Sequence, residues 1–220
     1  MIPLRDTIVS STRPVVTYAL IAANVGVWLY QQSLGGEFEP FIETHGLVPR
    51  RLVADWWSDV TPLFSSMFMH GGWLHLLGNV LYLHIFGDNV EDRLGHVRYL
   101  VLYLLAGGIA GLAQVLVDPT ASIPIVGASG AIAGVTGAYF LFFPRAKVVT
   151  LVPIFLFVQV VEIPAFFFLL FWFVFQLLLG LATVGVEAGG GIAFWAHIGG
   201  FVAGMTLGPA LIPRPVAHPA

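Results

Sequence analysis

Long apolar runs separated by polar segments predict a bundle of membrane-crossing helices. A helix needs about 20 residues to cross the hydrocarbon core of a bilayer. Six runs in the chain are of this length or only somewhat shorter. They cover residues 15–34, 73–86, 99–117, 127–143, 164–183 and 193–212. The pattern therefore predicts an all-α, polytopic membrane protein with six transmembrane helices in a single domain, residues 1–220.

Two segments between these runs have a different pattern. The segment 35–72 carries several charges and tryptophans such as Trp57. Because indole rings favour the membrane–water interface, we expect this segment to be a loop lying there. The stretch 151–161 is apolar, but Pro153 interrupts it and Glu162 follows it. We expect it to be an interfacial connector rather than a seventh span.

The composition supports the membrane assignment and excludes other classes of protein. Of the 220 residues, 58% are apolar and 10% are charged, whereas an ordinary soluble domain has about 25% charged residues. The net charge of −3 gives no reason to expect nucleic acid as a partner. The chain has no cysteine, which excludes disulfides, thiolate zinc sites and cysteine nucleophiles.

The distribution of basic residues predicts the orientation in the membrane. With the N-terminus in the cytoplasm, seven of the nine Lys and Arg residues fall in cytoplasmic segments, and Arg50 and Arg51 lie outside. Cytoplasmic loops are enriched in Lys and Arg, so both termini are predicted to be cytoplasmic. No organelle-targeting segment is evident, and we expect a multi-pass protein of a prokaryotic inner membrane.

Three groups of polar and small residues begin the second, fourth and sixth predicted helices. They are His70, His75 and Asn79 in the first group, Gly127 and Ser129 in the second, and His197 in the third. In the predicted topology all three groups lie at a similar depth near the outer face. Polar side chains inside a membrane need a partner or a function, so this convergence indicates a site.

Helical spacing predicts which of these residues share a face. His75 and Asn79 are four residues apart and therefore lie on one side of their helix. Ser129 and His197 each lie on a face lined by small residues, which allow membrane helices to approach closely. A histidine activates a serine hydroxyl when their atoms are about 2.6–3.2 Å apart. The faces of the fourth and sixth helices would permit that contact.

The same residues also allow a structural role or a metal site. A lone serine in a membrane helix usually bonds to its own backbone, and a lone interfacial histidine is more often structural. A zinc site would use His70, His75 and His197 as nitrogen ligands. The five-residue spacing of the first two departs from the HExxH pattern, and no acidic residue within a predicted span could act as general base. We therefore expect no metal and no cofactor.

The three groups resemble the motifs of the rhomboid family of intramembrane serine proteases. The matching segments are His70-x4-His75-x3-Asn79, Gly127-Ala128-Ser129-Gly130 and Ala196-His197-x2-Gly200. They occur in the family's order, and the resemblance extends from about residue 57 to residue 208. It implies the six-helix rhomboid-like bundle and hydrolysis of peptide bonds in or beside the transmembrane segments of substrate proteins.

The resemblance also implies a role for each motif residue. Ser129 corresponds to the nucleophile and His197 to the general base and acid. The side chains of His75 and Asn79, with the backbone N–H of Ser129, correspond to the oxyanion hole. Because no carboxylate lies in a predicted span, we expect a Ser–His dyad rather than a Ser-His-Asp triad.

Two further residues have supporting roles, and two positions depart from better-known members. His70 resembles the first motif histidine, in a supporting role, and Gly127 would allow a substrate backbone to approach closely. Trp57 is followed by Ser58 where some members have Trp-Arg. Ala133 stands where some members have a tyrosine that packs on the catalytic histidine.

The fifth predicted helix, 164–183, differs from its neighbours. It is rich in phenylalanine and lacks the small-residue faces of the fourth and sixth helices, so we expect looser packing. Together with the glycine-rich segment 189–191 it is predicted to form a lateral gate for substrates.

These expectations combine into an intramembrane serine endopeptidase that cleaves transmembrane protein substrates near the outer face of the lipid bilayer. The alternative is a non-catalytic rhomboid-like protein that binds membrane clients. A transporter or channel would favour charged residues midway through the spans or internal repeats, and the sequence has neither.

Overall fold

Helices occupy all six ranges that the apolar runs predict. The computed structural model describes residues 1–57, 59–154, 157–184 and 192–213. Its long helices are α1 (Val15–Ser33), α5 (Trp73–Leu94), α6 (His96–Val117), α7 (Ser129–Phe142), α8 (Ala165–Thr183) and α9 (Phe194–Leu211). Within the described residues, α6 and α8 combine the length and hydropathy needed to cross a membrane, and α7 is apolar but shorter. The number of six spans therefore stays a prediction.

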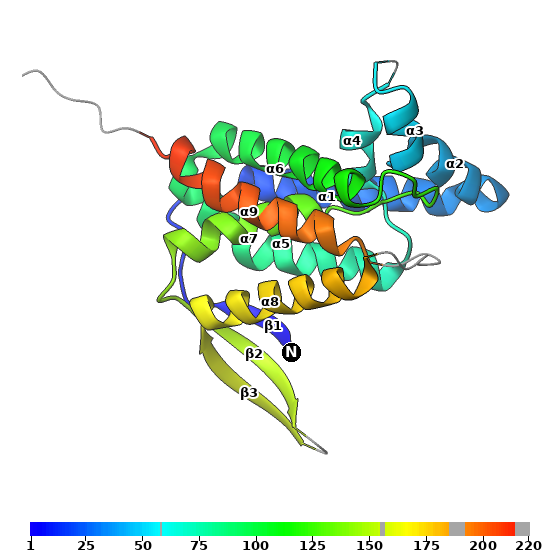
Figure 1. Ribbon diagram of the computed structural model, residues 1–220. Coiled ribbons are helices and arrows are strands. Elements are labelled where there is room, and N and C mark those ends of the chain that lie inside the picture. The colour runs from blue at the N-terminus through cyan, green and yellow to red at the C-terminus, as the bar shows by residue number, and fades with distance from the viewer. Residues whose placement is uncertain (58, 155–156, 185–191, 214–220) are drawn as a thin grey trace, which may run out of the picture.

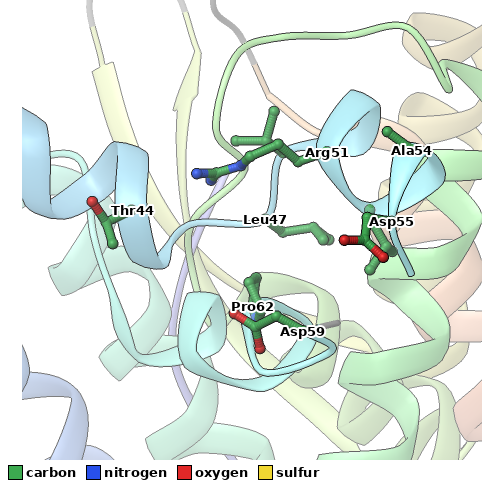
Figure 2. Close-up of a pocket in the computed structure, with 9 residues that line it drawn as sticks. Thr44, Leu47, Arg51, Ala54, Asp55, Asp59 and Pro62 are labelled. Atoms are coloured by element: carbon green, nitrogen blue, oxygen red, sulfur yellow. The ribbon is translucent and has the colours of Figure 1, made fainter. Parts of the chain in front are cut away.

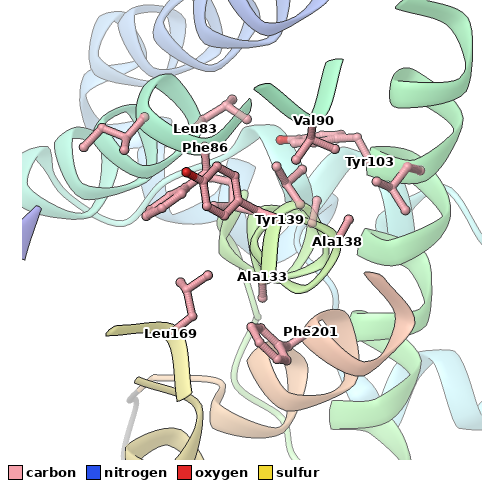
Figure 3. Packing of buried hydrophobic residues seen from close by; sticks show 14 of the residues in the cluster. Leu83, Phe86, Val90, Tyr103, Ala133, Ala138, Tyr139, Leu169 and Phe201 are labelled. Atoms are coloured by element: carbon pink, nitrogen blue, oxygen red, sulfur yellow. The ribbon is translucent and has the colours of Figure 1, made fainter. Parts of the chain in front are cut away.

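Helix α7 lies at the centre of the bundle, with α5, α6 and α9 packed around it (Figure 1). Every residue from 130 to 139 is buried, as expected for a helix that is covered on all sides. Figure 3 shows Phe86 of α5, Leu169 of α8 and Phe201 of α9 in the apolar cluster around it. The core of the molecule is therefore built around the helix that begins with Ser129.

Glycines set the distance between α7 and α9. A Cβ atom placed on Gly204 would overlap the carbonyl oxygen of Gly134, and one on Gly200 would overlap that of Gly130. The backbones of the two helices are therefore in direct contact. Such approaches between membrane helices require residues without a side chain.

The helix predicted over 73–86 continues to Leu94, into the polar segment expected to separate it from the run 99–117. Glu91, a charged residue of this extension, has partners in α1. Glu91 is fully buried, and its carboxylate accepts hydrogen bonds of 2.8 Å from the backbone N–H groups of Val16 and Thr17. The end of α5 thus caps the first turn of α1, whose N–H groups have no partner within their own helix.

The chain is mostly helical rather than all-α, which corrects the predicted fold class. Among the described residues, three strands form an antiparallel sheet in the order β1-β2-β3. They are β1 (Ile2–Asp6), β2 (Lys147–Ile154) and β3 (Phe157–Pro164). The described residues of the stretch 151–161, predicted as an interfacial connector, lie in β2 and β3, and β3 leads directly into α8 (Figure 1). Its valines favour extended strands.

The segment 35–72 consists largely of short helices, gathered at one end of the bundle (Figure 1). They are the 3-10 turns η1 (Gly35–Glu37) and η2 (Ser66–Phe68) and the helices α2 (Phe38–His45), α3 (Pro49–Ala54) and α4 (Pro62–Ser65). Leu47 and Ile125 exchange backbone hydrogen bonds of 3.1 and 2.8 Å. The segment is thereby joined to the chain that leads into α7.

Asp6, which lies outside the predicted spans, joins the N-terminal strand to the bundle. Its Oδ2 accepts hydrogen bonds from the hydroxyl of Tyr139 at 2.6 Å and from Nδ2 of Asn89 at 2.8 Å. Burial raises the pKa of Asp6 to about 6; the hydrogen bond from Tyr139 opposes this rise, and nearby Asp88 adds to it. Protonation of Asp6 at mildly acidic pH therefore favours the folded state.

We expect Gly204→Ala to destabilise the protein, because its methyl group must displace the carbonyl of Gly134 and separate α7 from α9. Overpacking of this kind costs about 1–3 kcal/mol. Gly26→Ala in α1 is the control, because a Cβ there has no neighbouring atom within 4 Å among the described residues and alanine favours a helix. Thermal unfolding in detergent measures both variants. Equal Tm values would contradict the described packing.

We expect Asp6→Asn to remove a pH dependence of stability. The native pKa of Asp6 is above its ordinary value of 3.8, so between about pH 4 and pH 6 Asp6 is protonated in the native state and ionised in the unfolded state. The free energy of unfolding therefore falls as pH rises through this range. Asparagine is neutral throughout this range and shows no such fall. Hydrogen exchange of the β1 amides across this range measures the effect, with Asp59→Asn at an exposed position as control. Identical slopes for wild type and Asp6→Asn would contradict the prediction.

Candidate active site

Ser129 and His197 meet where α7 and α9 begin. The Oγ atom of Ser129 lies 2.8 Å from Nε2 of His197, within the range required of a nucleophile and its base. Ser129 is the first residue of α7, and His197 lies in the first turn of α9. The close approach of the two helix backbones therefore brings together two residues that are 68 positions apart.

Gly127 turns the chain into α7, and two features of its position require glycine. Its φ angle of 125° is one that other residues rarely adopt. A Cβ atom there would also lie 2.5 Å from Nε2 of His75. The imidazole of His75 therefore occupies the space that a side chain at 127 would fill. This is a reason for the glycine that the sequence alone does not reveal.

Asn79 follows His75 by one turn of α5 and points to the same region. It is 7% exposed, and its Nδ2 has no hydrogen-bond partner among the described residues. This atom lies 3.7 Å from the Cβ position of Gly127. Leaving a buried donor unpaired costs about 1–3 kcal/mol. A buried, unpaired donor at this place is available to a ligand or to a developing negative charge.

His70 is buried and lies against His75, with the ring centroids 5.1 Å apart and the rings edge to face. Gln31 of α1 holds the backbone of His70 in place. Its Oε1 accepts a hydrogen bond of 3.0 Å from the N–H of His70, and its Nε2 donates one of 3.1 Å to the carbonyl. His70 is therefore held between α1 and His75, and the supporting role that the resemblance implies for it stays a prediction.

Two residues of α8 that the sequence motifs do not include also contact His197. Oε1 of Gln176 lies 2.8 Å from Nδ1 of His197. The ring of Trp172, one turn earlier, has its centroid 5.9 Å from that of His197. Gln176 carried a signal in the sequence, because an amide in an otherwise apolar span needs a partner. Its partner became evident only in three dimensions.

Gln114 of α6 holds the start of α9. Its Oε1 accepts hydrogen bonds from the backbone N–H groups of Trp195 at 3.1 Å and Ala196 at 3.3 Å. These N–H groups belong to the first turn of α9 and have no partner within the helix. The residue that precedes His197 is therefore fixed to a neighbouring helix.

A hollow of about 340 Å³ lies elsewhere, in the segment 35–72 (Figure 2). Thr44, Arg51 and Asp55 are among its lining residues, and the described lining includes none of the predicted site residues. Within the described ranges, no three His, Asp or Glu side chains are grouped so that they could hold a metal ion.

Comparison with known proteins gives the same family as the motifs. Residues 54–214 match the family model described as Rhomboid domain. The chain is 34% identical over 108 residues to RHOMBOID-like protein 5 of Arabidopsis thaliana, covering 49% of this chain and 34% of that protein. It is 33% identical over 129 residues to Rhomboid protease GluP of Bacillus subtilis (strain 168), covering 57% and 24%. With Rhomboid protein 1, mitochondrial, of Saccharomyces cerevisiae it shares 30% identity over 204 residues, covering 88% and 52%.

The matched part of the chain spans between 24% and 52% of the length of these three relatives. The relatives include plant, bacterial and yeast mitochondrial proteins, so they do not define one cellular membrane. The family model covers all three motif groups, from His70 to His197. The chain belongs to the rhomboid family of membrane proteins, which includes named proteases.

Proposed function

We propose that this protein is an intramembrane serine endopeptidase that cleaves the transmembrane segments of membrane-protein substrates near the outer face of the bilayer. The observation that carries the proposal is the 2.8 Å contact between Oγ of Ser129 and Nε2 of His197. A member of the same family, GluP, is named as a rhomboid protease. The unpaired donor of Asn79, which lies 3.7 Å from the Cβ position of Gly127, supports the same chemistry.

The proposed reaction proceeds through an acyl-enzyme. Nε2 of His197 takes the hydroxyl proton as Oγ of Ser129 attacks the carbonyl carbon of the scissile peptide bond. The tetrahedral intermediate collapses, His197 donates the proton to the leaving nitrogen, and the new amine departs. Water then attacks the ester on Ser129 with His197 again as base. Collapse releases a carboxylic acid and restores the serine.

The oxyanion of each tetrahedral intermediate is proposed to bind the side chains of His75 and Asn79 and the backbone N–H of Ser129. His75 lies directly against Gly127, and Asn79 is one turn away on the same helix. One such donor contributes about 2.7–4 kcal/mol to transition-state stabilisation. The donors therefore supply a large part of the proposed rate enhancement.

The base is proposed to work in a dyad. Among the described residues, the hydrogen-bond partners of the His197 ring are Ser129 and Gln176, and neither carries a charge. Ala133, where some relatives of this family have tyrosine, leaves no aromatic side chain from α7 at that position. The ring of Trp172 on α8 lies beside His197 instead.

Helix α8 is proposed to form the lateral gate for substrates. Beyond Leu169, its buried residues are Gln176 and Gly180, which lie against α9, and its other residues there are at least partly exposed. Phe171 and Phe175 are 58% and 50% exposed, as suits side chains that face lipid. The segment 189–191, the other part of the predicted gate, lies outside the described residues. Cytoplasmic termini and a prokaryotic inner membrane remain part of the proposal.

We expect Ser129→Ala and His197→Ala to abolish cleavage of a transmembrane substrate by the purified protein in detergent. Loss of a nucleophile or its base lowers kcat by about 10⁴-fold or more. A fluorophosphonate probe should label the wild type and Ser33→Ala, which changes an exposed serine of α1, but not Ser129→Ala. Cleavage that survives Ser129→Ala would contradict the dyad. Substrate binding without labelling or cleavage in the wild type would favour the client-binding alternative.

We expect Asn79→Ala to lower kcat by about 10²–10³-fold with little change in KM, because its donor is needed in the transition state. Asn24→Ala is the matched control, since Asn24 is also buried in a helix but donates to the carbonyl of Leu20 in its own helix. Steady-state kinetics and thermal unfolding of both variants separate loss of catalysis from loss of stability. A kcat unchanged by Asn79→Ala would remove this residue from the oxyanion hole.

A further inference from the structure

His197 has a polar neighbour that the reaction described above does not use. Its Nδ1 lies 2.8 Å from Oε1 of Gln176, while its Nε2 lies 2.8 Å from Oγ of Ser129. Gln176 is 8% exposed, so little water competes for the contact. We propose that Gln176 is a positioning residue that fixes the tautomer and the ring orientation of His197. This inference rests on the proposed protease function.

The tautomer of His197 decides whether it can act as a base. To take the proton of Ser129, Nε2 must carry a lone pair, so the ring hydrogen must be on Nδ1. Oε1 of Gln176 has lone pairs and no hydrogen, and its contact with Nδ1 therefore selects this tautomer. In Ser-His-Asp enzymes a buried carboxylate makes the same selection.

An amide suits this position better than a carboxylate. An ionised side chain is costly in a membrane-crossing helix, and Gln176 provides an acceptor without a charge. When His197 becomes an imidazolium ion, it donates through both ring nitrogens, and Oε1 of Gln176 still accepts from Nδ1. The same contact therefore serves His197 before and after proton transfer.

Trp172 supports the same assignment. It lies one turn before Gln176 on α8, so both side chains project from one face of the helix. Its ring is inclined by 36° to that of His197, with the centroids 5.9 Å apart. An aromatic ring on one side and an amide at Nδ1 together restrict rotation of the imidazole. Both restraints come from α8, whereas Ser129 is on α7.

A buried glutamine could also serve only to tie two helices together. Gln114 provides the comparison, because its Oε1 binds the backbone N–H groups of Trp195 and Ala196 rather than an imidazole. Both glutamines lie in long helices and contact the first turn of α9. Gln114→Leu is therefore a matched control for Gln176→Leu.

The first test measures the tautomer directly and does not depend on cleavage. In ¹⁵N-histidine-labelled protein in detergent, the NMR signals lost in His197→Ala identify the ring nitrogens of His197. We expect the Nδ1–H tautomer in the wild type and in Gln114→Leu, and a mixture of both tautomers in Gln176→Leu. An Nε2–H tautomer in the wild type, or an unchanged tautomer in Gln176→Leu, would overturn the proposal.

The second test measures catalysis as a function of pH. Gln176→Leu should lower kcat by about 10- to 100-fold with KM retained, as when other groups that orient a histidine are removed. Gln176→Glu keeps the acceptor and adds a charge that stabilises the imidazolium ion, so the acid limb of kcat/KM should shift to higher pH by about one pH unit. Gln114→Leu should lower Tm and leave the acid limb unchanged.

The two proposals fail in different ways. If Gln176 is only a structural tie, both leucine variants lose stability, and neither Gln176→Leu nor Gln176→Glu changes the kcat per folded protein or the acid limb. That result would overturn the positioning role. A wild type that neither cleaves nor reacts with the fluorophosphonate, but holds His197 in the Nδ1–H tautomer through Gln176, would contradict the protease function and leave the contact established.

Discussion

The direct contact between the backbones of α7 and α9 is the constraint on which the candidate site depends. Apolar side chains gain nothing from leaving lipid for another apolar surface, so membrane helices associate mainly through close packing and polar contacts. Here Gly200 and Gly204 lie on the carbonyls of Gly130 and Gly134. A larger separation would move His197 beyond hydrogen-bond reach of Ser129. The glycines that shape the bundle therefore also determine the geometry of the contact between Ser129 and His197.

Uncharged amides and charged carboxylates join the helices at different places in the bundle. Around the candidate site, the amides of Gln31, Gln114 and Gln176 each join one helix to a neighbouring element. Toward the other end of α5, the carboxylates of Glu91 and Asp92 bind the backbone where α1 begins. Amides satisfy buried backbone and imidazole groups without the cost of burying a charge. Neutral side chains thus hold the bundle together near the first turns of α7 and α9. Ionisable side chains hold it together at the end of α5 that lies near the sheet.

The sequence predicts the positions of the long helices well because the length of an apolar run is a local pattern. The order of the three groups selects Ser129 and His197, whose side chains the structure places 2.8 Å apart; their roles stay a prediction. The β2–β3 hairpin was not predicted, because a short apolar run with many valines has no helical or alternating period that distinguishes a strand from an interfacial segment. The extension of α5 was missed because the partners of Glu91 lie 74 and 75 residues away. Gln176 lies outside the sequence motifs for the same reason, since its contact with His197 joins two different helices.

The neutral environment of His197 has a consequence for how the proposed reaction is stabilised. With a glutamine at Nδ1 the pair of Ser129 and His197 carries no net charge before reaction, so no counterion has to be buried with it. Charge separates only as the serine attacks, when an imidazolium forms beside an oxyanion. These two charges develop next to each other, with the donors of His75 and Asn79 on the oxyanion side and the acceptor of Gln176 on the imidazolium side. Because fixed dipoles act strongly where water is excluded, the buried groups of Asn79 and Gln176 would favour the transition state of the proposed reaction over its ground state.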